Sequence, residues 1–337
     1  MLYRPLGKTG IDVSLLAFGS HTDHAYKRKS PIGFVLTEEG QSRRDRQIAK
    51  AFDLGVNFID VYEHEGQWEP LGKLIEARRA RVHVSASRNI DREPIGENID
   101  RAARQFGGYV DMYRMHYLPT HGEPERKYVD DWDVIRRGKE AGKLRAIGVS
   151  CHTEQQMMFA LRDLEDLDFV VFPYNFIHAK ADYSQFLPQA QERGIGLIAM
   201  KSLAAGSIAA LDPATRGVAT RPDDDRFQLY NSRDRKILPQ VVAELTKSLD
   251  QLPGETLCQA AIRYAYSRQF LSSVWCGMFD DRWVADNYTA LEHYRDLPHH
   301  EVAALERALE PARKLALLNG RSWLPDHYRW LEDEWRA

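Results

Sequence analysis

Short apolar runs that end in a polar or ionisable residue recur along this chain, and no other feature constrains its fold as tightly. One run ends at Asp60, another at His116 and a third at Ser150. Apolar runs bounded by turn residues are typical of buried parallel strands, and a (β/α)8 barrel keeps its functional groups at the carboxyl ends of such strands. The pattern therefore predicts a barrel with polar side chains at one end.

Eight runs of this kind occur, with segments of helical spacing between them. The runs cover residues 14–18, 57–61, 82–85, 110–115, 146–149, 169–172, 197–200 and 273–276, and helical spacing covers 43–54, 95–106, 132–141, 153–161 and 257–267. Eight strands alternating with helices predict an α/β fold, the closed (β/α)8 TIM barrel. An open doubly wound sheet is the alternative, but the turn Gly19-Ser20-His21 lacks the glycine-rich phosphate fingerprint of that fold.

Three segments lie outside the repeat. Residues 6–11 have the glycines of a tight turn, which predicts an N-terminal β-hairpin. A long loop, 204–252, follows the seventh strand. Connections of this length are often lids over a site, and a solvated surface loop is the other interpretation. The tail 301–337 combines helical spacing with several aromatic residues, so we expect it to pack on the barrel in a single domain, 1–337.

Composition excludes several classes of partner. The 337 residues carry a formal net charge of -3 and are 43% hydrophobic, which supports a large core and gives no electrostatic argument for nucleic acid binding. Cys151, Cys258 and Cys276 cannot all pair and lack metal-type spacing, as suits a reducing compartment. No apolar stretch reaches the ~18 residues of a membrane span. We expect a cytoplasmic protein that binds a small molecule, and the oligomeric state stays open.

Several motifs, in order along the chain, resemble the aldo-keto reductase family. They are the opening hairpin, the segments 55–60, 110–116 and 147–150, and Trp275-Cys276-Gly277 followed by Asp286-Asn287. Pro173-Tyr174-Asn175 and Met200-Lys201 are similar to a bacterial branch that often carries a C-terminal iron–sulfur motif. That motif is absent, because no cysteine follows Cys276. The resemblance covers nearly the whole chain and implies hydride transfer between NADP(H) and a carbonyl group.

The family uses a tetrad of Asp, Tyr, Lys and His, in which the Tyr protonates the carbonyl oxygen. Asp60 and His116 match the pattern position by position. Counting back from Leu71-Gly72, His64 falls nearest the Tyr position. Tyr62 is the weaker candidate for the acid, because on an extended strand it shares the face of Asp60.

The Lys of the tetrad is also missing from its expected position. Ser87 stands there with Arg88 beside it. Arg cannot donate a proton at neutral pH, but it could hold a negative charge nearby. The resemblance therefore implies a catalytic set made of Asp60, Tyr62, His64, Arg88 and His116.

The resemblance also implies a cofactor site with altered contacts. Cys151 stands where the family has an Asn, and Val171 where it has a Gln, so a bound nicotinamide ring would be less constrained. Arg282 could contact a 2'-phosphate, and the helix that begins near Asp280 would offer backbone amides to an anion. The implied cofactor-binding residues are Ser150, Cys151, Met200, Lys201, Gly277, Arg282, Asp286 and Asn287.

Histidines are concentrated after the predicted strand ends. Seven of the 12 lie there: His21, His24, His64, His116, His121, His152 and His178. Together with Glu65 and Asn175 they predict a polar cluster at the substrate end of the barrel. A divalent metal bound by His21, His64, His116 and His152 is one interpretation. The other is that polar loops simply collect histidines, since no HxH or HExxH spacing is present.

Three functions are compatible with these residues. The first is NADP(H)-dependent carbonyl reduction or alcohol oxidation on a small polar or sugar-like substrate. The second is a non-redox lyase, isomerase or epimerase that uses the histidines and carboxylates, with or without a metal, and the missing Tyr and Lys favour it. The third is a regulatory or binding protein with an inactive site.

Overall fold

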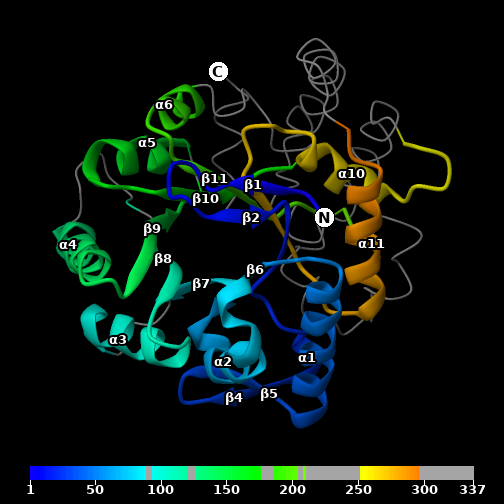
Figure 1. Cartoon of the computed structure of the whole chain (residues 1–337), viewed down its shortest axis with the longest axis horizontal. Coiled ribbons are helices and arrows are strands. Elements are labelled where there is room, and N and C mark those ends of the chain that lie inside the picture. Colours follow the sequence, from blue (N-terminus) through cyan, green and yellow to red (C-terminus); the bar gives the residue numbers. More distant parts are fainter. Residues whose placement is uncertain are drawn as a thin grey trace, which may run out of the picture.

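The structure, a computed structural model, describes residues 1–88, 93–117, 119, 126–152, 154–175, 185–203, 208–209 and 251–295. Within these residues the chain forms a barrel of strands surrounded by helices (Figure 1). Most of the predicted loop after the seventh strand and the whole of the predicted C-terminal tail lie outside the described residues.

The eight predicted strands close into one parallel barrel, which confirms the predicted fold class. In barrel order they are β3 (Leu16–Phe18), β6 (Phe58–Tyr62), β7 (His83–Arg88), β8 (Val110–His116), β9 (Leu144–Ser150), β10 (Phe169–Pro173), β11 (Gly196–Met200) and β12 (Ser273–Cys276). The predicted bounds differ from these by one to three residues at most ends, as strand ends usually do.

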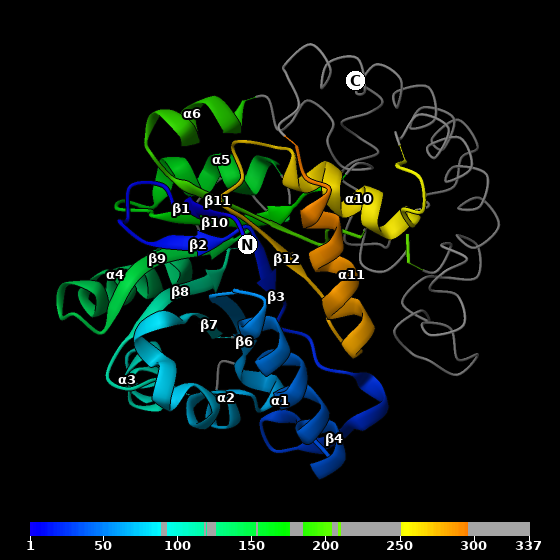
Figure 2. The same cartoon turned by 45° about the vertical axis from the view of Figure 1, so that its right-hand side comes forward.

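Helices cover the outside of the barrel. They are α1 (Glu38–Asp53), α2 (Trp68–Ile75), α3 (Ile95–Gln105), α4 (Arg126–Glu140), α5 (Glu154–Asp163), α6 (Phe186–Glu192), α10 (Leu257–Tyr266) and α11 (Asp281–Glu292), with short 3-10 turns η1 (His24–Tyr26), η2 (Glu63–Glu65) and η3 (Glu76–Arg81). Side-chain caps begin several of them: Thr37 accepts a hydrogen bond from the Gly40 amide, and Thr256 forms a capping box with Gln259. Helices α1 and α11 are neighbours outside β3 (Figure 2).

The predicted N-terminal hairpin is confirmed and closes the amino end of the barrel. Its strands β1 (Tyr3–Pro5) and β2 (Asp12–Ser14) are antiparallel. Leu6, Ile11 and Val13 join the apolar core inside the barrel. Gly7 has a φ of 54°, and a Cβ there would lie 2.3 Å from the Gly194 carbonyl oxygen. This close approach requires glycine.

Strand alternation separates an inner from an outer core. Along β6, Ile59 and Val61 pack against the helices, whereas Phe58 belongs to the core inside the barrel. Asp60 and Tyr62 are two and four residues further along, so they share the inward face of Phe58. The same period places Arg114 and His116 of β8 on the inward face that begins with Met112. The sheet therefore turns two ionisable residues from each of these strands toward the barrel axis.

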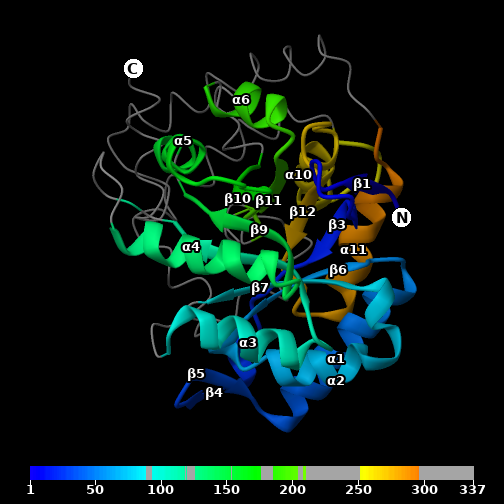
Figure 3. The same cartoon turned by 60° about the vertical axis from the view of Figure 1, so that its left-hand side comes forward.

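A second hairpin, which the sequence analysis did not predict, lies beside the carboxyl ends of the strands. It consists of β4 (Lys27–Ser30) and β5 (Gly33–Leu36) and is inserted between β3 and α1. In Figure 3 it lies at the bottom of the molecule, next to α1 and α2. Its residue Gly33 packs on the backbone of His64 in η2, where a Cβ would lie 2.5 Å from the His64 carbonyl oxygen. The hairpin therefore supports η2.

Among the described helices, none combines the length and the apolar character that a membrane span would need.

Candidate active site

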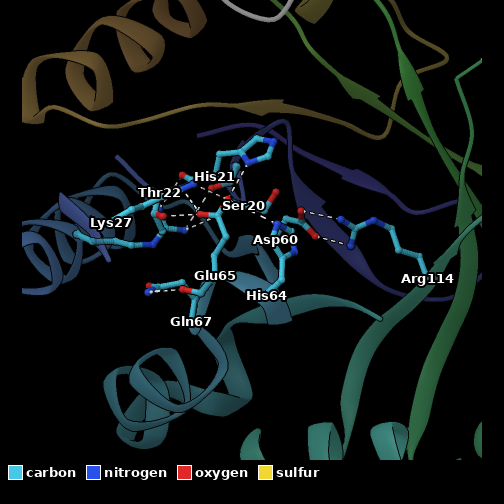
Figure 4. A network of polar contacts seen from close by, with 11 residues as sticks. Ser20, His21, Thr22, Lys27, Asp60, His64, Glu65, Gln67 and Arg114 are labelled. Carbon is cyan, nitrogen blue, oxygen red and sulfur yellow. Dashed lines mark hydrogen bonds and ion pairs between the residues drawn. The ribbon is translucent and has the colours of Figure 1, made fainter. Parts of the chain in front are cut away.

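An ion pair between Asp60 and Arg114 lies inside the barrel, below its carboxyl end. Arg114 Nη1 lies 2.7 Å from Asp60 Oδ1, Arg114 Nη2 donates to Oδ2 at 2.9 Å, and both side chains are fully buried. Arg114 also donates to the Ser85 hydroxyl at 3.2 Å. Burial raises the pKa of the Asp60 carboxyl, and the guanidinium of Arg114 opposes this effect. Figure 4 shows the pair beside the polar groups of the barrel end.

Tyr62 lies next to this pair, in contact with three histidine rings. Its ring centroid is 5.0 Å from that of His21, 5.1 Å from His64 and 6.3 Å from His116. The guanidinium carbon of Arg114 is 5.3 Å from the centre of the Tyr62 ring. Burial raises the pKa of the Tyr62 hydroxyl, while Arg114 lowers it. A phenol and a permanent cation therefore lie side by side.

Burial disfavours the charged forms of two imidazoles beside Tyr62, those of His64 and His116, and of the Lys201 amine near His116. Burial, followed by the nearby charge of Arg114, lowers the pKa of His116 to about 3. Burial also lowers the pKa of His64 and lowers the pKa of Lys201 to about 7. Lys201 follows β11 with a φ of 57°, and its carbonyl oxygen accepts a hydrogen bond from Asn175 at 2.9 Å. His116 is therefore suited to orient a substrate oxygen as a neutral imidazole.

Glu65 is the second buried carboxylate of the site, with 1% of its side chain exposed. Its Oε1 lies 3.0 Å from His21 Nδ1 and 2.9 Å from Lys27 Nζ. Its Oε2 accepts hydrogen bonds from the Thr22 amide, at 2.7 Å, and from the Thr22 hydroxyl. These partners hold the pKa of Glu65 far below its usual range despite burial. Glu65 is therefore an ionised anchor that joins the first barrel loop to the β4–β5 hairpin.

Arg88 faces a different part of the molecule from the one that the resemblance implied. Its Nη1 lies 3.4 Å from Asp131 of α4, and its Nη2 donates to the Glu93 carbonyl oxygen. Ser87, at the expected Lys position, is fully buried. The cation beside Asp60 is instead Arg114.

Of the residues predicted to contact the nicotinamide, some lie at the carboxyl ends of the barrel strands and one lies in the core between the strands and the helices. Ser150 and Met200 are buried at the carboxyl ends of β9 and β11, with Ser150 Oγ 4.0 Å from Met200 Sδ. Cys151 is fully buried and does not face the barrel interior. Its side chain belongs to the apolar core between the strands and the helices. Burial raises the pKa of its thiol, so this position offers a nicotinamide neither an amide nor a thiolate.

The other predicted cofactor residues lie along the start of α11. Gly277 is exposed after β12, and Arg282 is exposed in the first turn of the helix, which Asp280 caps. Asp286 is partly buried and Asn287 is buried. Within the described residues the Asn287 side-chain nitrogen has no hydrogen-bond partner. The buried amide donor of Asn287 is the feature that fits the nucleotide half of a dinucleotide.

The proposed metal site gains no support from the part of the chain that the structure describes, where no group of three or more His, Cys, Asp or Glu side chains is arranged to hold a metal ion. His152 lies after β9, where its amide donates to Gln156. His121 and His178 lie outside the described residues.

Two residues of the site were missed at the level of sequence. Arg114 had a usable signal, because a charged residue in the middle of an otherwise buried strand requires an ionic partner. Lys27 had none, because its contact with Glu65 depends on an inserted hairpin that is distant in sequence.

Comparison with known proteins adds an independent line of evidence. The sequence profile of the aldo/keto reductase family matches residues 37–310. L-glyceraldehyde 3-phosphate reductase of Escherichia coli is 23% identical over 325 residues, covering 87% of this chain and 88% of that protein. Aldo-keto reductase YhdN of Bacillus subtilis is 25% identical over 287 residues, covering 78% and 81%. The structure of the glycerol dehydrogenase AKR11B4 from Gluconobacter oxydans has the same fold, with a TM-score of 0.68, 18% identity and coverage of 92% and 95%.

Proposed function

The chain belongs to the aldo/keto reductase family of oxidoreductases, and from this premise we propose that it interconverts a carbonyl and an alcohol with NADP(H), on a small polar or sugar-like substrate. The observation that carries the proposal is the position of Tyr62. It lies against Arg114, which is paired with Asp60, and against the neutral imidazole of His116. A tyrosine, a cation, a carboxylate and a histidine thus meet at the barrel end.

Residues for both ends of the cofactor can be named. Arg282, Asp286 and Asn287 on α11 would hold the nucleotide half, since Asn287 offers a buried amide without a partner among the described residues. Ser150 and Met200 would border the nicotinamide. When bound, NADPH supplies the hydride that turns the carbonyl carbon into an alcohol carbon.

Proton transfer is the part that the chain's own residues perform. We assign the proton donor to Tyr62, whose O–H bond breaks as the substrate oxygen becomes an alcohol O–H. The tyrosinate left behind lies beside the Arg114 cation, which stabilises its negative charge. His116, neutral at physiological pH, would hydrogen-bond to the substrate oxygen and orient it. In alcohol oxidation the same groups act in reverse.

This arrangement weakens the case for a non-redox reaction. That alternative was favoured because the family's Tyr and Lys are missing from their expected positions. Tyr62 on β6 supplies a phenol and Arg114 on β8 supplies a cation, from positions other than those where the family has its Tyr and Lys. The reason for preferring proton transfer without hydride transfer is therefore reduced.

The test is a direct one. Purified protein is titrated with NADPH by fluorescence and then assayed for NADPH consumption with DL-glyceraldehyde, glyceraldehyde 3-phosphate and 4-nitrobenzaldehyde. Glyceraldehyde 3-phosphate is in the name of one similar protein, and glyceraldehyde is an oxidation product of glycerol, which is in the name of another. We expect saturable NADPH binding and turnover of at least one aldehyde. Absence of NADPH binding would remove the proposal, and turnover without consumption of NADPH would restore the non-redox alternative.

A further inference from the structure

His21 is the only one of the three histidines against Tyr62 that is hydrogen-bonded to Glu65. Its Nδ1 is 3.0 Å from Glu65 Oε1, whereas His64 Nε2 is 4.0 Å away. Because the Glu65 carboxylate can only accept a hydrogen bond, Nδ1 of His21 carries the hydrogen. Nε2 is then the ring nitrogen that can exchange protons with other groups. A histidine held by a carboxylate in this way can accept a second proton, since the negative charge stabilises the imidazolium.

The position of His21 links solvent to Tyr62. Its side chain is 60% exposed, and its ring is 5.0 Å from the partly buried ring of Tyr62. His64 is 27% exposed, and burial lowers the pKa of both His64 and His116. Of the imidazoles around Tyr62, His21 therefore has the widest access to water and the shortest contact with the Glu65 carboxylate.

Backbone contacts fix His21 at this position. Arg44 of α1 is buried, and its guanidinium donates to the carbonyl oxygens of His21 at 3.0 Å and Ser20 at 3.2 Å. On the other side, the amide and hydroxyl of Thr22 both donate to Glu65. The loop after β3 is thus clamped on both sides of His21.

We propose that His21, oriented by Glu65, carries protons between solvent and the hydroxyl of Tyr62. The inference rests on the proposed function, in which Tyr62 gives its proton to the substrate oxygen. The tyrosinate oxygen then takes the proton from Nε2 of the His21 imidazolium, directly or through one water, and Nε2 takes a new proton from water. No electrons are transferred in this step. His21 acts through Tyr62 and does not need to touch the substrate.

The kinetic test separates the first turnover from the following ones. In His21→Ala, Tyr62 starts protonated, so the first turnover with NADPH and an aldehyde probe should keep the wild-type rate within about twofold. Steady-state kcat should fall on the order of 10- to 100-fold, as for loss of a proton-transfer group, and added imidazole should restore it. Equal losses in both phases, an unchanged kcat, or no rescue by imidazole would each overturn the relay.

His64→Gln is the matched variant. His64 also packs on Tyr62 but lies further from Glu65, so any loss in this variant should not be restored by imidazole. Rescue of both variants alike would show general buffering by small molecules and would also overturn the assignment.

A second measurement requires no substrate. In protein with 15N-labelled histidine, neutral His21 should be the Nδ1–H tautomer, and the Nε2 signal of His21 should differ in Tyr62→Phe, where the hydroxyl that exchanges a proton with Nε2 is absent. The titratable and charged groups that face His21 include Asp60 and His116 as well as Glu65, Lys27, His64 and Tyr62, so the comparison is made at constant pH and salt. Identical Nε2 signals in the two proteins would overturn the relay even if no aldehyde is reduced, whereas a difference without any turnover would mean that the proposed function alone has failed.

Discussion

Arg114 reaches Asp60 across the strand that separates them. Tyr62 of β6, Ser87 of β7 and Arg114 of β8 are in register, so the small side chain of Ser87 lies between the phenol and the guanidinium. Arg114 passes Ser85, to which it donates, and forms the two-point ion pair with Asp60. A positive charge is thus placed beside Tyr62 even though position 87 cannot supply one.

Removal of this cation should cost stability as well as activity. Arg114→Met leaves the Asp60 carboxylate buried without its partner, which should lower the free energy of unfolding by about 3 to 5 kcal/mol. Urea denaturation at neutral pH measures the change. The double variant D60N/R114M should recover most of the lost stability, because it removes both charges, while its kcat stays low. If the double variant is as unstable as the single one, the pair is not the source of the effect.

Substitutions can distinguish Tyr62 from His64 as the proton donor. Tyr62→Phe removes only the hydroxyl, so kcat should fall by about 100-fold or more while the thermal midpoint stays near that of the wild type. His64→Gln should have a smaller effect, because the ring of His64 is one neighbour of Tyr62 among three. Measurement of kcat for both variants decides between the two residues, and the reverse order would assign the proton donor to His64.

Much of the fold could be predicted because each barrel strand is buried on both faces. Such strands appear in sequence as short apolar runs, and all eight were found with errors at their ends. The β4–β5 hairpin was missed because Lys27, Arg28 and Lys29 interrupt any apolar pattern. That hairpin is held by contacts with η2 and by the ion pair to Glu65, and such tertiary contacts leave no local pattern.

The candidate site was predictable only where the signal was local. Asp60 and Tyr62 follow from alternation along one strand, and the structure places both in the inner layer. The partners of these residues come from other strands, so position in the sequence indicated Ser87 and Arg88 for the cation, whereas the cation next to Asp60 in space is Arg114. Arg88 forms an ion pair with Asp131 instead, and Arg114, two residues before His116, is the partner of Asp60.

Acidification should destabilise the protein through His116. Its pKa in the folded state, about 3, lies below the unfolded value of 6.5, so the unfolded state binds the proton first as the pH falls. The stability is complete above pH 6.5 and decreases toward pH 3, by up to about 1.4 kcal/mol per pH unit. His116→Gln should show a shallower decrease between pH 6.5 and 4.5, before Glu65 begins to contribute. Parallel curves for the two proteins would contradict the prediction.

Lys201 should make stability rise with pH in alkaline solution. Burial lowers its pKa from 10.5 to about 7, so above pH 7 the folded state releases a proton that the unfolded state still binds, and stability should rise until about pH 10.5. Lys201→Met carries no charge and should lack this rise, being more stable than the wild type at pH 6 by about 1 kcal/mol or more. Lys201→Arg has the same left-handed backbone but a permanent charge, so it should be the least stable of the three across the whole range. Chemical denaturation between pH 6 and 10 measures all three proteins, and a wild type that follows the arginine variant throughout would mean that Lys201 keeps its proton in the folded state.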